Sequence, residues 1–394
     1  MTTSIGIKRP YSALSKRSRS TESNRSNSSQ SARKASEERM DDAYCVPAFL
    51  RLTRQEILER FQGLESLQRG RMLKSVQASD PDSPWAVEQT ADTRARNRYT
   101  NVYPWANNRV HLQVPPDHCD YINASPIILH GSKPGKDKKY IATQGPKEGQ
   151  FSHIWRMIWH EATDPAVIVM LTQTWEAGRD KCFQYFPEDL KANDELTIND
   201  DDEFGDGFKA TVKLLSLSQD IASRSAIRKM TLTVDGKEKT IWHLLFSGWP
   251  DFCVPEGENQ SALLRLIKLS EEYNTIPENP RIVHCSAGVG RSGTFIALDY
   301  LLQELDDGSI EEAVNKIPHF DPVFDTVNKL REQRMTMVQS DSQLVFIYQV
   351  LKERWLEKRS TMSVNGASKQ HSEPQAPEGT EEPEPRPPGA FPED

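Results

Sequence analysis

The residues with the clearest chemical potential are a cysteine and an arginine that flank a glycine-rich turn. Residues 283–294 have the sequence VHCSAGVGRSGT, in which Cys285 ends a short apolar run and Arg291 precedes an apolar helical pattern. Gly288 and Gly290 allow the backbone to curl so that successive N–H groups point into one concavity. Such a concavity at a helix N-terminus attracts an anion, and the planar fork of Arg291 matches two phosphate oxygens. The spacing therefore predicts a phosphate-binding loop.

Cys285 lies at the centre of this positive field, so its pKa should fall well below the roughly 8.5 of a free thiol. An inert buried cysteine and a nucleotide-phosphate loop are the alternatives. A nucleotide loop places Lys before Ser or Thr, whereas here Arg291 precedes Ser292. We predict that the Cys285 thiolate attacks phosphorus without a metal or a cofactor. The phosphate would be held by Arg291 and by the backbone of five residues: Ser286, Ala287, Gly288, Val289 and Gly290.

The elements that must position this loop alternate along the chain. Apolar residues at helical spacing predict a helix from Pro47 to Ser75. Strand-forming runs follow at Tyr140 to Ala142, Ala166 to Leu171, Lys229 to Val234 and Lys239 to Phe246. A last strand at Ile282 and Val283 leads into the turn and then into a helix from Thr294 to Leu302. Interspersed strands and helices predict the α/β class, of the α+β type, with a mixed sheet flanked by α-helices in a single domain.

The two ends of the chain differ in composition from its centre. Residues 1–40 carry nine Lys and Arg against three Asp and Glu, and the last residues are acidic and rich in proline. Such segments bury too little apolar surface to offset their ordering entropy. We predict a disordered basic tail at 1–44, a catalytic domain at 45–358 and a disordered acidic tail at 359–394. The net charge of −8 argues against a nucleic acid as partner.

Cysteine usage and hydropathy indicate the compartment. The five cysteines are scattered without a C-x-x-C pair, which argues against a disulfide framework and a zinc site. The N-terminus lacks the apolar block of a secretory signal, and no run of 18 or more apolar residues predicts a membrane span. We expect a soluble cytoplasmic protein that also enters the nucleus. The acidic run Asn199 to Asp206 predicts a solvated loop.

The string around Cys285 resembles the signature of the tyrosine-specific protein phosphatases, (I/V)-H-C-S-x-G-x-G-R-(S/T)-G. A bare C-x5-R pattern also marks dual-specificity phosphatases and arsenate reductases, so other motifs must decide. The resemblance runs from near Cys45 to near Glu357 with the motifs in the family's order, and dual-specificity enzymes lack this length. It implies a non-receptor, cysteine-dependent enzyme, with the fungal-like cytosolic type as one option, and the family's highly twisted sheet.

Residues 247–255, SGWPDFCVP, resemble the mobile loop that carries the family's general acid. The resemblance implies that Asp251 protonates the leaving oxygen, a contribution of typically about 10²–10⁴-fold, and that Trp249 anchors the loop. An ordinary Pro-Asp turn is the alternative. The family usually has Gly where Cys253 stands. This departure leaves two questions open: how fast the loop opens, and whether Cys253 forms a regulatory disulfide with Cys285.

Residues 96–99, RNRY, are similar to the family's substrate-recognition loop. The resemblance implies that Tyr99 forms one wall of a slot whose bottom phosphotyrosine can reach and phosphoserine cannot. The family commonly has an Asp two residues further on that binds the substrate backbone. This chain has Asn101, which keeps hydrogen-bonding capacity but lacks the charge.

The resemblance also implies supporting roles around the loop. Glu176 would pair with Arg291 and Lys181 would approach the acid loop, with a surface ion pair as the alternative. Gln339 would orient the hydrolytic water, assisted by Gln343, unless both merely cap the following helix. Two assignments concern the neighbours of the nucleophile: Ser292, whose hydroxyl would stabilise the departing thiolate, and His284, which would support the loop without contacting substrate.

Together these motifs predict a protein-tyrosine-phosphatase, a metal-independent phosphoric monoester hydrolase that forms a phosphocysteine intermediate and acts in signal transduction. The expected partners are phosphotyrosine-containing proteins, with a MAP kinase as one candidate. Basophilic kinases could modify the basic tail at residues 16–20 and 33–36. A catalytically weak phosphotyrosine-binding adaptor and a dual-specificity or lipid phosphatase are the alternatives.

Overall fold

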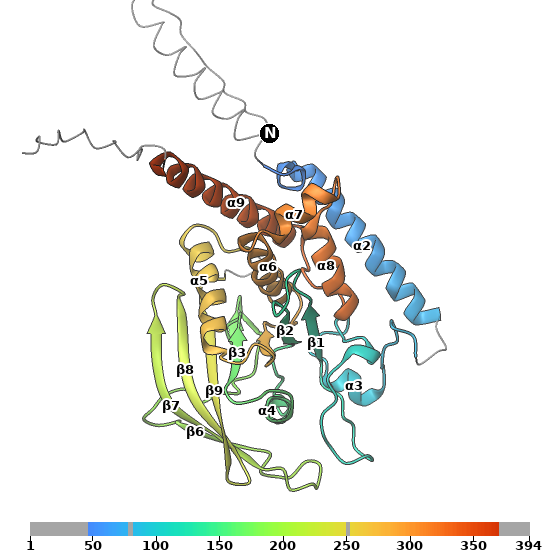
Figure 1. Ribbon diagram of the computed structural model, residues 1–394. Coiled ribbons are helices and arrows are strands. Elements are labelled where there is room, and N and C mark those ends of the chain that lie inside the picture. Colours follow the sequence, from blue (N-terminus) through green and yellow to red (C-terminus); the bar gives the residue numbers. More distant parts are fainter. Residues whose placement is uncertain (1–45, 78–81, 250–252, 370–394) are drawn as a thin grey trace, which may run out of the picture. The chain divides into compact units, whose positions relative to one another are not determined.

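The computed structural model describes residues 46–77, 82–249 and 253–369 (Figure 1). Every element below lies in the unit Ala48–Asp394. Its main sheet has eight strands in the order β1-β2-β10-β3-β9-β8-β7-β6. Their bounds are β1 (Ala124–Leu129), β2 (Lys138–Thr143), β3 (Ala166–Met170), β6 (Glu195–Ile198), β7 (Ala210–Asp220), β8 (Ser225–Val234), β9 (Lys237–Phe246) and β10 (Arg281–His284). A separate hairpin pairs β4 (Trp175–Glu176) with β5 (Arg179–Asp180).

The described residues also form two short 3₁₀ helices and eight α-helices. These are η1 (Ala48–Arg51), η2 (Ala106–Asn108), α2 (Arg54–Gln77), α3 (Ala91–Arg96), α4 (Phe151–Glu161), α5 (Glu258–Tyr273), α6 (Gly290–Asp306), α7 (Ser309–Lys316), α8 (Pro322–Gln333) and α9 (Asp341–Lys369). None of the helices in the described part of the chain has the length and apolar character needed to cross a bilayer. α9 continues beyond residue 358, where the sequence predicted the catalytic domain to end.

The centre of the sheet is parallel. β10 runs parallel to β2 on one side and to β3 on the other, and β3 is parallel to β9. All residues of β3 and β10 are buried. Strands covered on both faces need continuous apolar runs rather than an alternating pattern, which explains the sequence of residues 166–170. The outer pairs of strands are antiparallel.

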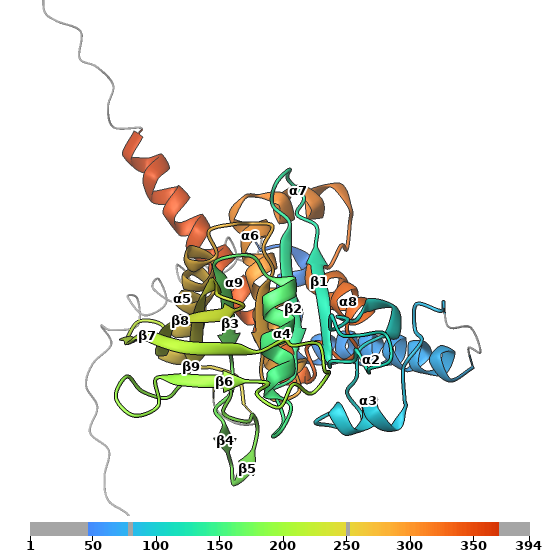
Figure 2. The ribbon, with the colours of Figure 1, turned by 90° about the horizontal axis from the view of Figure 1, so that it is seen from below.

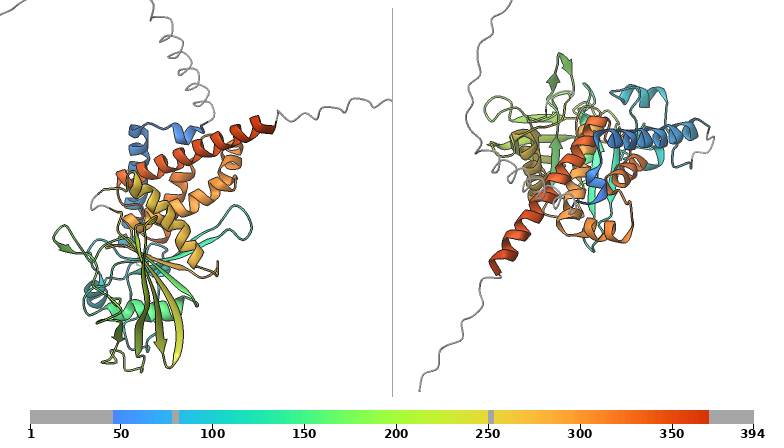
Figure 3. Two further views of the ribbon diagram at one scale, coloured as in Figure 1. Left: turned by 90° about the vertical axis from the view of Figure 1, so that its left-hand side faces the viewer. Right: turned by 90° about the horizontal axis from the view of Figure 1, so that it is seen from above.

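Helices cover both faces of this sheet (Figures 1 and 3). On one face, Ile154 and Ile158 of α4 share a hydrophobic core with Ile168 and Met170 of β3. Alternate strand residues point to opposite faces, so Val169 is directed to the other side, where α5 and α6 contact the central strands. α6 is buried around most of its circumference because α8 and α9 cover it from outside.

The candidate site lies where β10 passes into α6. β10 ends at His284 and α6 begins at Gly290, so the predicted phosphate loop leaves the carboxyl end of a central parallel strand. In open α/β sheets, ligands bind outside the carboxyl ends of the strands. The layers therefore place the loop at a buried helix N-terminus on a rigid frame.

The acidic run Asn199–Asp206 is a loop whose carboxylate residues are exposed or half-exposed, as predicted, but two of them also bind side chains of α4. The carboxylate of Asp206 accepts hydrogen bonds from both terminal nitrogens of Arg156, at 2.6 and 2.8 Å. Glu203 accepts from His153 Nε2 at 2.8 Å. Both partners lie on α4, and the sequence of the loop alone does not reveal which side chains the fold brings to it from another element.

Candidate active site

The loop around Cys285 is shaped by close contact with the end of β2. Cys285 is 5% exposed, and the backbone N–H of Gly288 donates to its Sγ at 3.2 Å. Gly288 has a φ of +71°, and a Cβ added there would lie 2.1 Å from the Thr143 carbonyl oxygen. Glycine alone fits such a backbone position. The structure therefore places the sulfur inside the loop, facing backbone N–H groups.

The thiol of Cys285 is more acidic than an ordinary cysteine. Burial alone would raise its pKa, but the Ser292 hydroxyl, the Arg291 guanidinium and the backbone N–H groups of Ser292 and Gly288 outweigh burial and lower it. Ser292 Oγ is buried and finds no oxygen or nitrogen partner among the described residues, so its proton is available to the sulfur. The surroundings thus favour a thiolate, which is the nucleophilic form.

Arg291 is held in a defined orientation by Glu176. Its Nη1 and Nη2 donate to the two carboxylate oxygens at 2.7 and 2.8 Å, and Nη1 also donates to the Leu171 carbonyl at 3.0 Å. The side chains are only 12% and 9% exposed. Burial would raise the pKa of Glu176, but hydrogen bonds from Arg291 and from the backbone of Gln173 outweigh it and lower the pKa. The carboxylate is therefore ionised at neutral pH, and the guanidinium fork is oriented before any ligand binds.

Tyr99 stands directly against the phosphate loop. Its hydroxyl and Ser286 Oγ lie 2.8 Å apart, and Ser286 Oγ donates to the Lys181 carbonyl at 2.8 Å. Because the single Ser286 proton is used in that bond, Tyr99 donates to Ser286. Tyr99 thus contacts the phosphate loop, and its role as one wall of a slot stays a prediction. Asn101 lies two residues further on, in an exposed turn.

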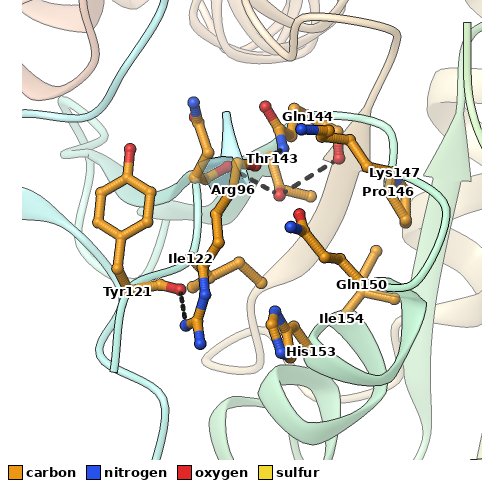
Figure 4. A pocket seen from close by; sticks show the side chains of 11 residues that line it. Arg96, Tyr121, Ile122, Thr143, Gln144, Pro146, Lys147, Gln150, His153 and Ile154 are labelled. Atoms are coloured by element: carbon orange, nitrogen blue, oxygen red, sulfur yellow. Dashed lines mark hydrogen bonds between the residues drawn. The ribbon is translucent and has the colours of Figure 1, made fainter. Parts of the chain in front are cut away.

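A narrow cleft lies behind the recognition loop, lined by residues of α3, β2 and α4 (Figure 4). Gln144 bonds to that loop twice, because its Nε2 donates to the Arg96 carbonyl and its Oε1 accepts from the Arg98 N–H, both at 2.8 Å. Arg98 Nη1 also donates to Asp180 Oδ2 at 2.6 Å. The segment after β2 and the β4–β5 hairpin therefore hold the recognition loop from both sides.

Gln339 and Gln343 both lie over the start of α6. A Cβ added to Gly290 would lie 3.0 Å from Gln343 Nε2 and 3.4 Å from Gln339 Cβ. Gln343 Oε1 accepts from the backbone N–H of Gln339 at 2.9 Å and of Ser340 at 3.3 Å. Gln343 thus caps the beginning of α9, as the alternative interpretation expected. The side chain of Gln339 remains exposed beside the loop.

The predicted general acid, Asp251, lies outside the described residues. The described residues on either side of it are joined by a hydrogen bond, in which Trp249 Nε1 donates to the Cys253 carbonyl at 3.0 Å. Trp249 is 5% exposed, which suits an anchor, and Cys253 is exposed.

Arg334 is the main residue of the site that sequence reasoning missed. It is fully buried, and its Nε donates to the Gly288 carbonyl at 2.9 Å while Nη2 donates to Asn123 Oδ1 at 2.7 Å. Burial lowers its pKa to about 10, which still leaves it charged. By binding loop carbonyls from behind, Arg334 helps to turn the N–H groups inward. The sequence offers only a short arginine-rich string, with no sign of which arginine is buried.

A buried hydrogen-bonded chain leads from β9 to the nucleophile. His284 Nδ1 lies 3.2 Å from the Cys285 carbonyl, which can only accept, so Nδ1 donates. His284 Nε2 must then accept from the Tyr185 hydroxyl at 2.7 Å, which leaves that oxygen to accept from His243 Nε2 at 3.1 Å. Burial lowers the pKa of His284 to about 4 and that of His243 well below its ordinary value. Both imidazoles are therefore neutral, and their tautomers are determined.

The remaining predicted residue, Lys181, follows β5 and contributes its backbone carbonyl to the contact with Ser286. The described residues contain no group of three or more His, Cys, Asp or Glu side chains arranged to hold a metal ion. The site therefore combines a stabilised thiolate, an oriented guanidinium and an aromatic side chain bonded to the phosphate loop, a combination suited to nucleophilic attack on a phosphate ester.

Comparison with known proteins agrees with this geometry. A family model described as protein-tyrosine phosphatase matches residues 93–353, which is more than half of the chain. The matched segment includes the phosphate loop, the recognition loop and both glutamines. The chain belongs to the protein-tyrosine phosphatase family, a class of hydrolases.

Curated relatives differ in how much of their length the chain spans. Tyrosine-protein phosphatase 1 of Saccharomyces cerevisiae is 34% identical over 331 residues, which cover 78% of this chain and 96% of the relative. Tyrosine-protein phosphatase 2 of Schizosaccharomyces pombe is 35% identical, over 75% of this chain but 38% of the relative. Phosphatidylinositol phosphatase PTPRQ of Homo sapiens is 36% identical, over 75% of this chain and 11% of the relative. The chain thus spans well under half of the latter two proteins.

Among solved structures, PTPN18 in complex with HER2 phosphopeptides is similar with a TM-score of 0.59 and 25% identity, covering 76% of this chain and 93% of that chain. Another PTPN18 structure gives a TM-score of 0.60 at the same identity and covers 96% of that chain. The predicted family, hydrolase class and fold of a mixed sheet flanked by helices are confirmed.

Proposed function

We propose that this protein hydrolyses phosphotyrosine in other proteins through a phosphocysteine intermediate. The observation that carries the proposal is the lowered pKa of Cys285 in a loop whose Arg291 is already oriented by Glu176. A thiolate surrounded by N–H donors and a guanidinium matches a phosphoryl group that must be both bound and attacked. Membership of the protein-tyrosine phosphatase family supports the same reaction.

In the first step, phosphotyrosine enters beside Tyr99 and its dianion binds the backbone N–H groups of residues 286–291 and the Arg291 fork. The Cys285 sulfur attacks phosphorus in line with the bond to the tyrosyl oxygen. That bond breaks as Asp251 gives its proton to the leaving oxygen. The products are tyrosine and a phosphocysteine, and the oriented donors stabilise the charge on the equatorial oxygens.

In the second step, water attacks the phosphorus of the phosphocysteine. Gln339, exposed beside the loop, orients this water, and Asp251 accepts its proton. The sulfur–phosphorus bond breaks and the thiolate leaves, stabilised by the Ser292 hydroxyl that already lowers the pKa of Cys285. Inorganic phosphate is released and the enzyme returns to its starting state.

The test uses the purified full chain with p-nitrophenyl phosphate and a phosphotyrosine peptide, in the presence of EDTA. Wild-type protein should hydrolyse both, and acid quenching should trap a phosphocysteine. Cys285→Ser should abolish turnover and retain peptide binding. Cys119→Ser is the matched control, because Cys119 contributes only its backbone carbonyl to a hydrogen bond near the site. Turnover of Cys285→Ser at the wild-type rate would contradict the proposal.

A second candidate substrate is a phosphoinositide, because a relative that is 36% identical is named a phosphatidylinositol phosphatase. The hydrogen bond from Tyr99 to Ser286 instead favours a flat aromatic ester, since it sets the ring as a wall against the phosphate loop. Values of kcat/KM on a phosphotyrosine peptide and on a soluble phosphoinositide distinguish the two. A higher value on the phosphoinositide would reverse the assignment.

We further propose that the protein acts in cytoplasmic and nuclear signalling. In this proposal the catalytic domain is flanked by a basic tail at residues 1–44 and by an acidic tail, and phosphorylation of the basic tail is one means of regulation. A phosphorylated MAP kinase is one candidate substrate. Capture of phosphoproteins by the Asp251→Ala form would identify the substrates. Deletions that test the acidic tail should begin after Lys369, because α9 continues to that residue.

A further inference from the structure

The β4–β5 hairpin carries an exposed tryptophan next to the phosphate site. Trp175 is 63% exposed, although an indole can bury 150–250 Å², roughly, in a contact. Figure 2 shows the hairpin projecting from the eight-stranded sheet. Single exposed apolar residues are common on protein surfaces, so exposure alone assigns Trp175 no role. The attachment of the hairpin is what distinguishes this residue.

Three contacts attach the hairpin to the active site. The carboxylate of Glu176 accepts hydrogen bonds from both terminal nitrogens of Arg291. The carboxylate of Asp180 accepts a hydrogen bond from Arg98 of the recognition loop at 2.6 Å. The backbone carbonyl of Lys181, directly after β5, accepts a hydrogen bond from the hydroxyl of Ser286 in the phosphate loop. The hairpin is therefore joined to both loops that are proposed to hold the phosphotyrosine.

The register of the hairpin determines which side each residue occupies. Ala177 and Gly178 both have positive φ, at 47° and 73°, as in the two-residue turns that favour a tight hairpin. Trp175 pairs with Asp180, and directly paired residues project from the same face. Trp175 therefore shares the face of Asp180, whose carboxylate binds the recognition loop, while Glu176 projects from the other face toward Arg291.

We propose that Trp175 is a specificity residue that binds an apolar or aromatic side chain of the substrate at a position flanking the phosphotyrosine. The proposal rests on the proposed function. Asp180, the cross-strand partner of Trp175, binds Arg98 of the recognition loop, so the face that carries Trp175 is the one from which residues flanking the phosphotyrosine would approach. Aromatic and apolar side chains gain from contact with the indole ring.

The test uses phosphotyrosine peptides that are identical except at one flanking position, which carries Phe, Leu, Ala or Arg. Each position on both sides of the phosphotyrosine is varied in turn. For each enzyme, kcat/KM on a peptide is divided by kcat/KM on p-nitrophenyl phosphate, which has no flanking residues. Wild-type protein should prefer Phe or Leu over Ala by about three- to tenfold at one or two positions, chiefly through KM.

Trp175→Ala should remove this preference, and Trp175→Phe should retain part of it. Ile317→Ala is the matched control, because Ile317 is also an exposed apolar residue, at 55%. It follows α7, which comes after the end of α6 that is remote from the phosphate loop. The control should keep the wild-type ratios. An unchanged Phe-to-Ala ratio in Trp175→Ala, or a wild-type preference for Arg, would overturn the proposal for Trp175. Absence of hydrolysis of every substrate by wild-type protein would instead refute the proposed function.

Discussion

Replacing Glu176 with Gln separates the orientation of Arg291 from its charge. The carboxylate holds the guanidinium with two hydrogen bonds, at 2.7 and 2.8 Å. A glutamine has nearly the same shape, but it offers one acceptor oxygen and no negative charge. In the variant, Arg291 would keep its bond to the Leu171 carbonyl, at 3.0 Å, and one neutral bond to the amide.

The substitution should lower two quantities for different reasons. A hydrogen bond to a charged group contributes about 1.5–3 kcal/mol. Losing one of these bonds and weakening the other should therefore reduce the free energy that holds the Arg291 guanidinium in its orientation by about 2–4 kcal/mol. If that orientation serves the transition state, kcat/KM falls by about 30- to 1,000-fold. Removing a negative charge from beyond the guanidinium should also lower the pKa of Cys285, because the positive charge of Arg291 then acts on the thiolate with less compensation. Activity should therefore fall although the thiolate becomes more stable.

Both quantities can be measured on the same protein. Stopped assays with p-nitrophenyl phosphate give kcat/KM, and the pH dependence of alkylation by iodoacetamide gives the pKa of Cys285. Glu188→Gln, an exposed position on the surface, serves as the control and should change neither quantity. Wild-type kcat/KM in Glu176→Gln would refute the role of orientation. A raised pKa of Cys285 would refute the electrostatic reasoning.

Three further predictions concern the nucleophile and the groups behind it. In wild-type protein, Cys285 should alkylate at pH 7 as a thiolate, with a pKa below the roughly 8.5 of a free thiol, whereas Ser292→Ala should raise that pKa. Arg334→Met should lower the free energy of unfolding by at least about 3 kcal/mol in urea titrations, because it leaves buried carbonyl oxygens without donors, whereas the exposed Arg69→Met should change it little. Burial keeps His243 neutral in the folded protein, whereas in the unfolded chain it takes up a proton near pH 6.5. The folded state therefore loses stability as the pH falls below that value. Between pH 7.5 and pH 5, the free energy of unfolding of wild-type protein should fall by about 2 kcal/mol more than that of His243→Gln.

The parts of the site that the sequence predicted are those encoded by neighbouring residues. The loop from Cys285 to Arg291 follows from a strand, two glycines and a helix start within one short string, so its shape is largely local. The central strands could also be recognised, because full burial requires uninterrupted apolar runs. The resemblance to a family extended these predictions to Glu176 and Tyr99, which lie far from the loop in sequence, and the structure places both beside it.

The parts that the sequence did not predict depend on burial of polar groups brought from distant elements. Arg334 reaches Gly288 from 46 residues further along the chain, and nothing in its local sequence distinguishes it from a surface arginine. The same holds for Tyr185 and His243, whose contacts across the sheet orient His284. Propensity and periodicity report which face of an element is apolar, and they do not identify which polar side chains the apolar core will enclose.

Three arginines give the site a framework that does not depend on pH. Each binds at least one backbone carbonyl: Arg291 binds Leu171, Arg334 binds Gly288 and Arg98 binds Gly145. Guanidinium groups stay protonated over the working range of proteins, and a carbonyl cannot titrate, so these contacts persist while other groups change charge. The pH dependence of the reaction should consequently arise from the groups that touch the phosphoryl group or its leaving oxygen. Because Glu176 neutralises much of the charge of Arg291, the backbone N–H groups and Ser292 must supply a substantial share of the stabilisation that keeps Cys285 ionised.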